Sequence, residues 1–341
     1  MDPFALAREQ SRSTPGRYVG LAVAAHGTIR STAFLDGRDL EHQPRSSIAS
    51  ITKPITATAV MQLVEAGALD LDAPVDTYIG ELSPRSPDGI ARPSAVTSAG
   101  VLSHTGGLTD LPDDELFALE PTPEAMLRAI SATKLAYDPG TEHRYASEPW
   151  YLLSAAIERI SGLPFATFVS QRILEPLGMS DTGFDPAADG PEALPPLGAF
   201  GGPGLSPEER MPLFTSLVMP GGGLWSTPDD VLRFGRAMLH GGTLDGVRIL
   251  LNGSVEVMTS SRTDGLVHPD TGEPVRYGLG WALQPGWGAS ASAFWHSGST
   301  GSLLLVDPAH DLVVVYLRNW WGVSSEATNE AIRAVYAWLD R

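Results

Sequence analysis

Two segments near the ends of the chain carry apolar runs of the kind that form β-hairpins. Residues 17–25 and 28–34 flank His26-Gly27, which predicts two strands around a turn. Residues 303–306 and 312–317 are rich in Leu and Val and flank a turn that contains a proline. Strand pairs at both ends of a chain can share one sheet, so we expect the two termini to lie close together.

The middle of the chain has helical periodicity instead. Its apolar segments begin after hydroxyl caps or end at glycines, as helices do. The predicted helices are 51–66, 149–160, 165–174, 228–240 and, at the carboxyl end, 325–339. No period of about 20–50 residues repeats, which excludes a solenoid or a propeller. This order of elements predicts an α+β fold with a discontinuous sheet domain, residues 1–80 and 245–341, and a mostly helical domain over residues 81–244.

Composition is typical of a soluble globular protein. The 341 residues are 43% hydrophobic and 18% charged, and 40 acidic against 23 basic residues leave a net charge of −17. That charge repels phosphate backbones and anionic lipid, so we expect neither nucleic-acid binding nor membrane docking. The chain has no cysteine, which excludes disulfides, thiolate metal sites and a cysteine nucleophile. Residues 1–8 do not form a secretory leader and no run of 18 apolar residues exists, so we expect a cytoplasmic protein.

Several common catalytic patterns are absent from the sequence. No serine lies in Gly-x-Ser-x-Gly, and there is no P-loop and no Gly-x-Gly-x-x-Gly between a strand and a helix. The eight histidines are scattered, and no two have the spacing of metal ligands on a helix. We therefore expect neither a metal site nor a cofactor.

The strongest chemical signal is Ser50-Ile51-Thr52-Lys53 at the start of the predicted helix 51–66. Residues three apart share one helical face, so the Lys53 amine can reach the Ser50 hydroxyl. A serine is unreactive until a base takes its proton, and a desolvated lysine can do that. The helix start also offers N–H groups and a partial positive charge to an oxyanion. Ser-x-x-Lys alone also occurs in ordinary helices, where the serine caps the helix and the lysine is solvated. The surrounding sequence therefore has to distinguish a catalytic pair from an ordinary helix start.

That surrounding sequence, Ser50 to Val75, closely resembles the serine β-lactamase and penicillin-binding-protein superfamily. The similarity is greatest to the branch that contains class C β-lactamases, D-amino-acid peptidases and family VIII carboxylesterases. Further segments resemble the family in the same order: Leu102–Leu108, Gly221–Asp230, Tyr277–Trp281 and His296–Gly298. The resemblance covers roughly residues 18–340. It implies a β-lactamase/transpeptidase-like fold, an antiparallel sheet flanked by helices, with the active site between the two domains.

Tyr145-Ala146-Ser147 matches the family's second catalytic motif, Tyr-x-Asn. The resemblance gives Tyr145 the role of moving the proton between Ser50, Lys53 and the leaving group. Ser147 departs from the family, whose asparagine contacts the lysine and the amide of the substrate's acyl side chain. A serine can still bond Lys53 but lacks the paired amide donor and acceptor, which argues against amide and β-lactam recognition.

His296-Ser297-Gly298 matches the third motif, in the His-x-Gly form of esterases and D-aminopeptidases instead of the Lys-Thr-Gly of β-lactamases. We assign His296 and Gly298, with Ser147, to substrate binding, because Gly298 lets a substrate approach the strand without a Cβ clash. The resemblance implies that the N–H groups of Ser50 and Ser299 form the oxyanion hole. Histidine weakens the fixed positive charge near pH 7, which argues against a carboxylate-bearing penicillin as the main substrate.

Two further groups of residues are weaker candidates. His104 could be paired with Ser50, but the family uses this segment to support the site, so we interpret His104 as structural. We also expect one tryptophan to contact the substrate, drawn from Trp225, Trp281, Trp287 and Trp295.

These residues predict a serine hydrolase that works through an acyl-serine intermediate, with a carboxylesterase acting on small or medium acyl esters as the favoured activity. Two alternatives use the same chemistry: a D-amino-acid peptidase or amidase with weak β-lactamase activity, and an acyltransferase or cyclase in a biosynthetic pathway. The intact Ser50, Lys53 and Tyr145 argue against a catalytically silent binding protein. The sequence does not indicate which ester or amide is used, which of Lys53 and Tyr145 is the base in each step, or the oligomeric state.

Overall fold

The computed structural model describes residues 1–13, 15–80, 96–116, 118–197, 215–269, 271–321 and 324–339. Within them an antiparallel seven-stranded sheet has the order β3-β2-β1-β11-β10-β9-β8. Its strands are β1 (Tyr18–Ala25), β2 (Thr28–Leu35), β3 (Arg38–Asp39), β8 (Ala282–Leu283), β9 (Phe294–Ser297), β10 (Leu303–Asp307) and β11 (Leu312–Arg318). Because β1 pairs with both β2 and β11, the two terminal hairpins share one sheet, as predicted.

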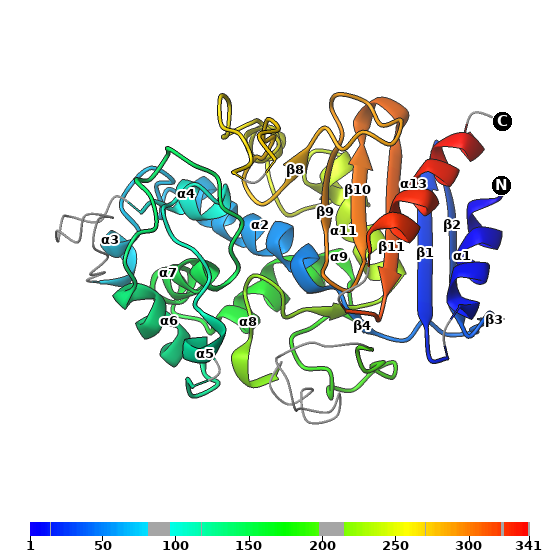
Figure 1. The fold of residues 1–341 in the computed structure, drawn as a ribbon, viewed down its shortest axis with the longest axis horizontal. Coiled ribbons are helices and arrows are strands. Elements are labelled where there is room, and N and C mark those ends of the chain that lie inside the picture. The colour runs from blue at the N-terminus through cyan, green and yellow to red at the C-terminus, as the bar shows by residue number, and fades with distance from the viewer. Residues whose placement is uncertain are drawn as a thin grey trace.

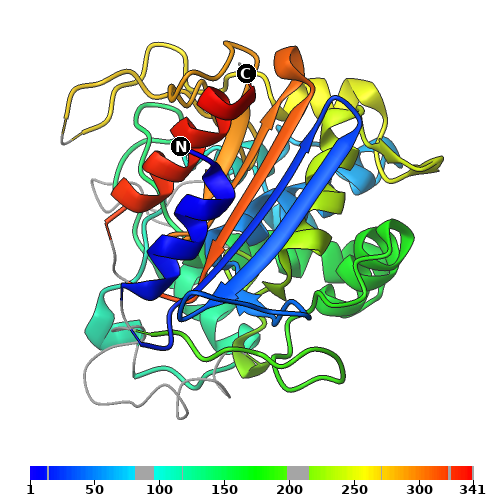
Figure 2. The same ribbon diagram turned by 90° about the vertical axis from the view of Figure 1, so that its right-hand side faces the viewer.

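Helices cover both faces of this sheet (Figures 1 and 2). Helices α1 (Pro3–Arg12) and α13 (Glu326–Leu339) lie side by side on one face, and α11 (Pro228–Leu239) packs on the other. All eight residues of β1 are therefore buried, which explains why its sequence is a continuous apolar run rather than an alternating one.

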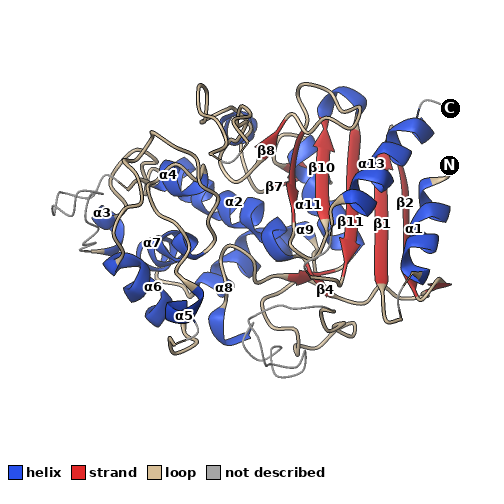
Figure 3. Ribbon diagram, viewed as in Figure 1, coloured by secondary structure: helices blue, strands red, loops and turns tan. Residues whose placement is uncertain are grey.

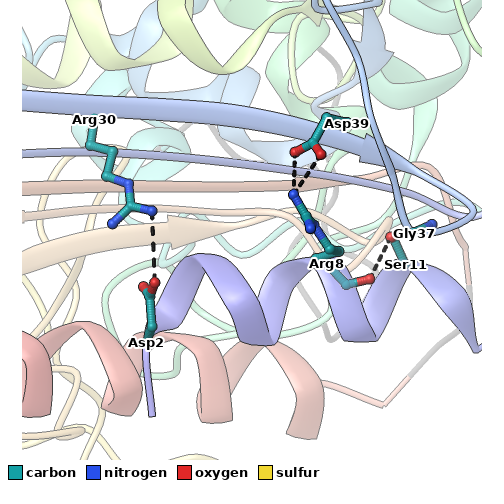
Figure 4. Close-up of polar contacts among 6 residues, drawn as sticks. All are labelled: Asp2, Arg8, Ser11, Arg30, Gly37 and Asp39. Atoms are coloured by element: carbon teal, nitrogen blue, oxygen red, sulfur yellow. Dashed lines mark hydrogen bonds and ion pairs between the residues drawn. The ribbon is translucent and has the colours of Figure 1, made fainter.

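The sequence patterns did not predict α1, because its exposed face is strongly polar. Phe4 on its inner face is 2% exposed and joins the core between this helix and the sheet. Two ion pairs tie the helix to strands β2 and β3, Arg8 to Asp39 at 2.5 Å and Arg30 to Asp2 at 3.7 Å (Figure 4). The amino and carboxyl ends consequently lie close together, as expected from the shared sheet.

The second part of the structure is mainly helical and lies beside the β8–β9 end of the sheet (Figure 3). Its longest helix is α2 (Thr52–Glu65), which is buried along nearly its whole length and packs against α7 and α8. The other helices of this part are α3 (Asp76–Ile79), α4 (Ser98–Leu102), α5 (Asp113–Leu116), α6 (Pro123–Ala132), α7 (Tyr151–Ser161), α8 (Phe165–Val169) and α9 (Glu175–Leu177). Short elements complete the site region: strands β4 (Ser46–Ser47) and β5 (Trp225–Ser226), the 3₁₀ turns η1 (Ala49–Ile51) and η2 (Glu148–Trp150), and the π-helical turn η3 (Ser170–Leu174). Helix α12 (Asn252–Met258) and the strand pair β6 (Thr243–Leu244) and β7 (Val247–Arg248) lie between α11 and β8 in the chain.

The predicted division of the chain needs two corrections. The boundary at residue 80 places α2 and α3 with the sheet domain, whereas both pack against α7 of the helical part. The boundary at residue 244 places α11 with the helical region, whereas α11 packs on β1, β10 and β11. Apolar periodicity identifies a helix but does not reveal which surface its buried face covers. Residues 81–95, 117 and 198–214 of the predicted helical domain lie outside the described residues.

None of the described helices is long and apolar enough to cross a membrane alone. One bent pair, Glu148–Ser161 with Phe165–Leu177, meets the length and composition criteria together, with a bend of 76° between its halves.

Candidate active site

Ser50 lies in the turn η1, between strand β4 and helix α2. The preceding Ala49 has φ +47°, a left-handed conformation that alanine rarely adopts. Thr52 fixes this turn, because its hydroxyl donates to the Ala49 carbonyl at 2.7 Å and accepts from the Leu224 N–H at 3.1 Å. The Ser50 side chain is therefore held at the start of a buried helix without serving as its cap.

The Lys53 side chain lies beside Ser50, and the residue is 0% exposed. Its Nζ atom is 3.2 Å from Ser50 Oγ, 3.0 Å from Ser147 Oγ and 2.7 Å from the Gly221 carbonyl oxygen. The ring centroids of Tyr145 and Trp150 are 4.8 and 5.5 Å from Nζ. The described residues supply neutral acceptors and aromatic faces to Lys53, and no carboxylate forms an ion pair with it.

Gly221 closes the site from the side of the β5 strand. A Cβ atom at this position would lie 3.2 Å from Lys53 Nζ and 3.0 Å from the Ser147 carbonyl oxygen. The Thr56 hydroxyl donates to the Pro220 carbonyl at 2.7 Å and so anchors the segment to α2. The sequence analysis did not single out the carbonyl of Gly221 as a partner of Lys53.

Tyr145 stands at the mouth of the site and is 47% exposed. Its hydroxyl has no hydrogen-bond partner among the described residues, while its ring packs on that of His104 at a centroid distance of 4.4 Å. The phenol is thus held by its ring, next to Lys53, with its oxygen available. Its place fits the predicted proton-transfer role, which stays a prediction.

His296 on β9 is 3% exposed and uses both ring nitrogens inside the protein. Nδ1 lies 2.8 Å from the Ser297 carbonyl oxygen, which can only accept, so Nδ1 carries the proton. Nε2 therefore accepts from the Tyr277 hydroxyl at 2.9 Å. Burial, aided by the charge of Lys53, lowers the pKa of His296 to about 3. The ring is neutral near pH 7 and, in this arrangement, has no free nitrogen to offer a substrate.

Gly298 follows β9 and packs on the Ser50 turn. A Cβ atom there would lie 2.6 Å from the Ile48 carbonyl oxygen and 3.2 Å from Ala49 Cβ. The need for glycine thus comes from contact between protein segments, whereas the sequence analysis attributed it to substrate approach. The next residue, Ser299, is exposed, and its N–H has no acceptor among the described residues, as an oxyanion-hole donor requires.

Sequence reasoning missed two polar residues beside the catalytic loop, Asp110 and Glu148. The Asp110 carboxylate accepts from the N–H groups of Ser147 at 2.5 Å and Glu148 at 3.0 Å. Burial, then Asp110, raise the pKa of Glu148 to about 9, so this carboxyl is protonated near neutral pH. It adds no negative charge beside Lys53.

The four candidate tryptophans do not approach Lys53. Trp225 and Trp281 are fully buried, and Trp295 packs on Trp287 at 5.0 Å, in contact with the core cluster that includes α1 and α13. The tryptophan at the site is Trp150, which opens α7. Among the described residues no group of three or more His, Asp or Glu is placed to hold a metal ion.

The antiparallel sheet with helices on both faces, and the buried α2 that carries Lys53 beside Ser50, define a β-lactamase/transpeptidase-like fold. The profile of the Beta-lactamase family matches residues 6–337. The chain belongs to that family of serine hydrolases.

Curated relatives differ in their names. Protein Rv1367c of Mycobacterium tuberculosis (H37Rv) is 32% identical over 315 residues, which cover 79% of this chain and 76% of the relative. Esterase EstB of Burkholderia gladioli is 35% identical over 188 residues, 48% of this chain and 45% of EstB. An Escherichia coli K12 protein with the provisional name D-alanyl-D-alanine carboxypeptidase is 26% identical over 326 residues, 83% of this chain and 72% of the relative.

Solved structures share the fold. EstCE1, described as a hydrolase with promiscuous acyltransferase activity, superposes with a TM-score of 0.82 at 22% identity over 98% of this chain and 97% of its own. A penicillin-binding protein homologue from Pyrococcus abyssi gives 0.77 at 22% identity, over 99% of this chain and 76% of its own. A hydrolase with acyltransferase activity and a penicillin-binding protein homologue therefore share this architecture.

Proposed function

We propose that this protein is a carboxylesterase that hydrolyses neutral acyl esters through an acyl intermediate on Ser50. The observation that carries the proposal is the state of His296. It stands where the resemblance places the lysine of β-lactamases, yet it is neutral, buried and bonded on both nitrogens. A substrate carboxylate would find no fixed cation there, whereas a neutral ester needs none.

In the proposed reaction the Ser50 hydroxyl adds to the ester carbonyl while Lys53, as the free amine, takes the proton. The N–H groups of Ser50 and Ser299 receive the oxyanion. The carbon–oxygen bond to the alcohol then breaks, and the alcohol leaves with a proton delivered through Tyr145. Water adds to the acyl carbon by the reverse route, which releases the carboxylic acid and restores Ser50.

The short Ser147 side chain supports esters over amides. Its hydroxyl is 3.0 Å from Lys53 Nζ and keeps that contact of the family's asparagine. It carries no amide to pair with the acyl amide of a peptide or a β-lactam. The names of EstB and EstCE1 agree with an esterase. The name of the Escherichia coli relative agrees instead with the peptidase alternative, so a test has to distinguish ester hydrolysis from amide hydrolysis.

The test compares phenyl butyrate with 3-carboxyphenyl butyrate, which differ in one leaving-group carboxylate, together with a chromogenic cephalosporin and a D-alanine anilide. A carboxylate that is desolvated at the site without a cation costs at least about 1.4 kcal/mol, which corresponds to about tenfold in kcat/KM, so the neutral ester should be favoured by about that factor. Ser50→Ala on each substrate is the background control. A preference for the carboxylated ester, or anilide hydrolysis as fast as ester hydrolysis, would overturn the proposal.

A further inference from the structure

The segment that precedes Asp110 contains a histidine in an unusual backbone conformation. His104 is 4% exposed and has φ +59°, the left-handed region that residues other than glycine and asparagine seldom occupy. Such a conformation costs about 1 kcal/mol or more and persists only where surrounding contacts enforce it. Two of the hydrogen bonds that His104 makes lead to the catalytic loop.

His104 forms hydrogen bonds with the residues on both sides of Tyr145 in the chain. Its carbonyl oxygen accepts from the Arg144 N–H at 3.0 Å, and its Nδ1 atom accepts from the Ala146 N–H at 3.2 Å. Its ring packs on the Tyr145 ring between these two bonds, at a centroid distance of 4.4 Å. One residue thus holds the backbone before Tyr145, the backbone after it and the face of its side chain.

Asp110 continues this support along the loop. Its Oδ1 atom accepts from the N–H groups of Ser147 and Glu148, at 2.5 and 3.0 Å. His104 and Asp110 therefore bind the N–H groups of residues 144, 146, 147 and 148. The loop that carries Tyr145 and Ser147 is therefore held in place by two residues of one short segment. His104 holds the part of the loop around Tyr145, and Asp110 holds the part around Ser147.

The hydrogen bond to Ala146 requires an unprotonated Nδ1. Burial lowers the pKa of His104 well below its ordinary value, and the positive charge of Lys53 acts in the same direction. Nε2 is buried without an acceptor among the described residues, so a charged ring would have no counter-group. His104 is held neutral, with Nδ1 as an acceptor.

We propose that His104 is a positioning residue that fixes the Tyr145 phenol for proton delivery to the leaving alcohol. The proposal deepens the proposed esterase function and rests on it. It makes specific the supporting role that the resemblance implied for the segment of His104. Since an aryl alcohol leaves without much help and an alkyl alcohol needs the proton, loss of His104 should matter most for alkyl esters.

The test uses two substitutions that both tolerate the left-handed backbone. His104→Gly removes the acceptor and the ring, whereas His104→Asn retains an acceptor at the place of Nδ1. We expect His104→Gly to lower kcat on ethyl butyrate at least about tenfold more than kcat on 4-nitrophenyl butyrate, as a misplaced general acid would. His104→Asn should recover most of the difference. Ser103→Ala is the matched control, because among the described residues its hydroxyl bonds only Ala99 and Thr105 and not the catalytic loop.

A double-mutant cycle with Tyr145→Phe decides whether His104 acts through Tyr145. In the Tyr145→Phe background, His104→Gly should cause little further loss, since the group it positions is already absent. Equal losses in both backgrounds, or an equal loss on both esters, would overturn the positioning role. If His104→Gly does not fold, His104→Asn is the deciding variant. The positioning role would be overturned if His104→Asn lowered kcat on ethyl butyrate, relative to kcat on 4-nitrophenyl butyrate, as much as Tyr145→Phe does. Failure of the wild-type protein to hydrolyse either ester would instead refute the proposed function.

Discussion

Gly298 packs so tightly against Ile48 that a Cβ atom on the glycine would lie 2.6 Å from the Ile48 carbonyl oxygen. This contact seats the end of β9 against the turn that carries Ser50. Both segments supply N–H groups to the proposed oxyanion hole. The distance between the N–H groups of Ser50 and Ser299 therefore depends on residue 298 having no side chain.

Gly298→Ala should push the strand end away from the Ser50 turn. We expect kcat on nitrophenyl esters to fall by about two orders of magnitude, the usual cost of losing one oxyanion-hole donor. Gly253→Ala is the control, because nothing lies within 4 Å of a Cβ at that position, and its kcat should stay at the wild-type value. Wild-type activity in Gly298→Ala would place the oxyanion hole elsewhere.

Lys53→Arg tests whether Lys53 moves a proton or only supplies charge. A guanidinium is permanently protonated and cannot accept the Ser50 proton, so Lys53→Arg should be nearly as damaging as Lys53→Ala. The two kcat values are measured side by side on the same ester. An arginine variant close to the wild type would mean that a fixed charge is sufficient.

Ser147→Asn tests the departure from the family's Tyr-x-Asn motif. A missing hydrogen bond to a buried amide costs roughly 1–3 kcal/mol, so restoring it should raise anilide or cephalosporin hydrolysis relative to ester hydrolysis by about tenfold. The quantity to compare is the ratio of the two kcat/KM values before and after the substitution. An unchanged ratio would show that Ser147 does not set the choice between esters and amides.

Asp307 offers a test of stability away from the site. The buried carboxylate accepts from the N–H and the hydroxyl of Ser290, from His310 Nδ1 and from the Tyr336 hydroxyl, at 2.9, 2.5, 2.8 and 2.8 Å. Burial alone would raise the pKa of Asp307, but these hydrogen bonds outweigh it and hold the pKa below its ordinary value. The charged form therefore stabilises the fold above the unfolded-state pKa, and that stabilisation is lost as the pH falls through the folded-state pKa.

Asp307→Asn should accordingly lower the free energy of unfolding at pH 7 by about 1–3 kcal/mol. Thermal melts should show that the difference in Tm from the wild type shrinks below about pH 4. Asp311→Asn is the control, since Asp311 is exposed and has a left-handed φ of +46° that asparagine also adopts. A Tm difference for Asp307→Asn that does not change with pH would show that the charge is not what stabilises the fold.

Local patterns predicted much of the fold and the centre of the site. The terminal hairpins follow from apolar runs around turn residues, and the contact between Ser50 and Lys53 follows from their spacing on a helix. The resemblance supplied Tyr145 and the segment that ends in Gly298, which no periodicity identifies. Their catalytic roles remain predictions.

Other features depend on contacts between distant segments and have no local signature. The bonds from His104 to the loop around Tyr145 join residues about forty positions apart, and the left-handed backbone of His104 cannot be read from its residue type. The neutral state of His296 depends on its burial and on the charge of Lys53, which belongs to a distant segment of the chain. Trp150, instead of one of the four named tryptophans, has its ring centroid 5.5 Å from Lys53 Nζ, although the two residues are far apart in the sequence.

The most direct test of the central claim, an acyl intermediate on Ser50, is peptide mass mapping after rapid acid quench of the protein during turnover of a nitrophenyl ester. The account predicts the acyl mass increment on the peptide that contains Ser50, and no increment in Ser50→Ala. An increment on any other peptide, or turnover by Ser50→Ala at a tenth of the wild-type rate or more, would contradict it.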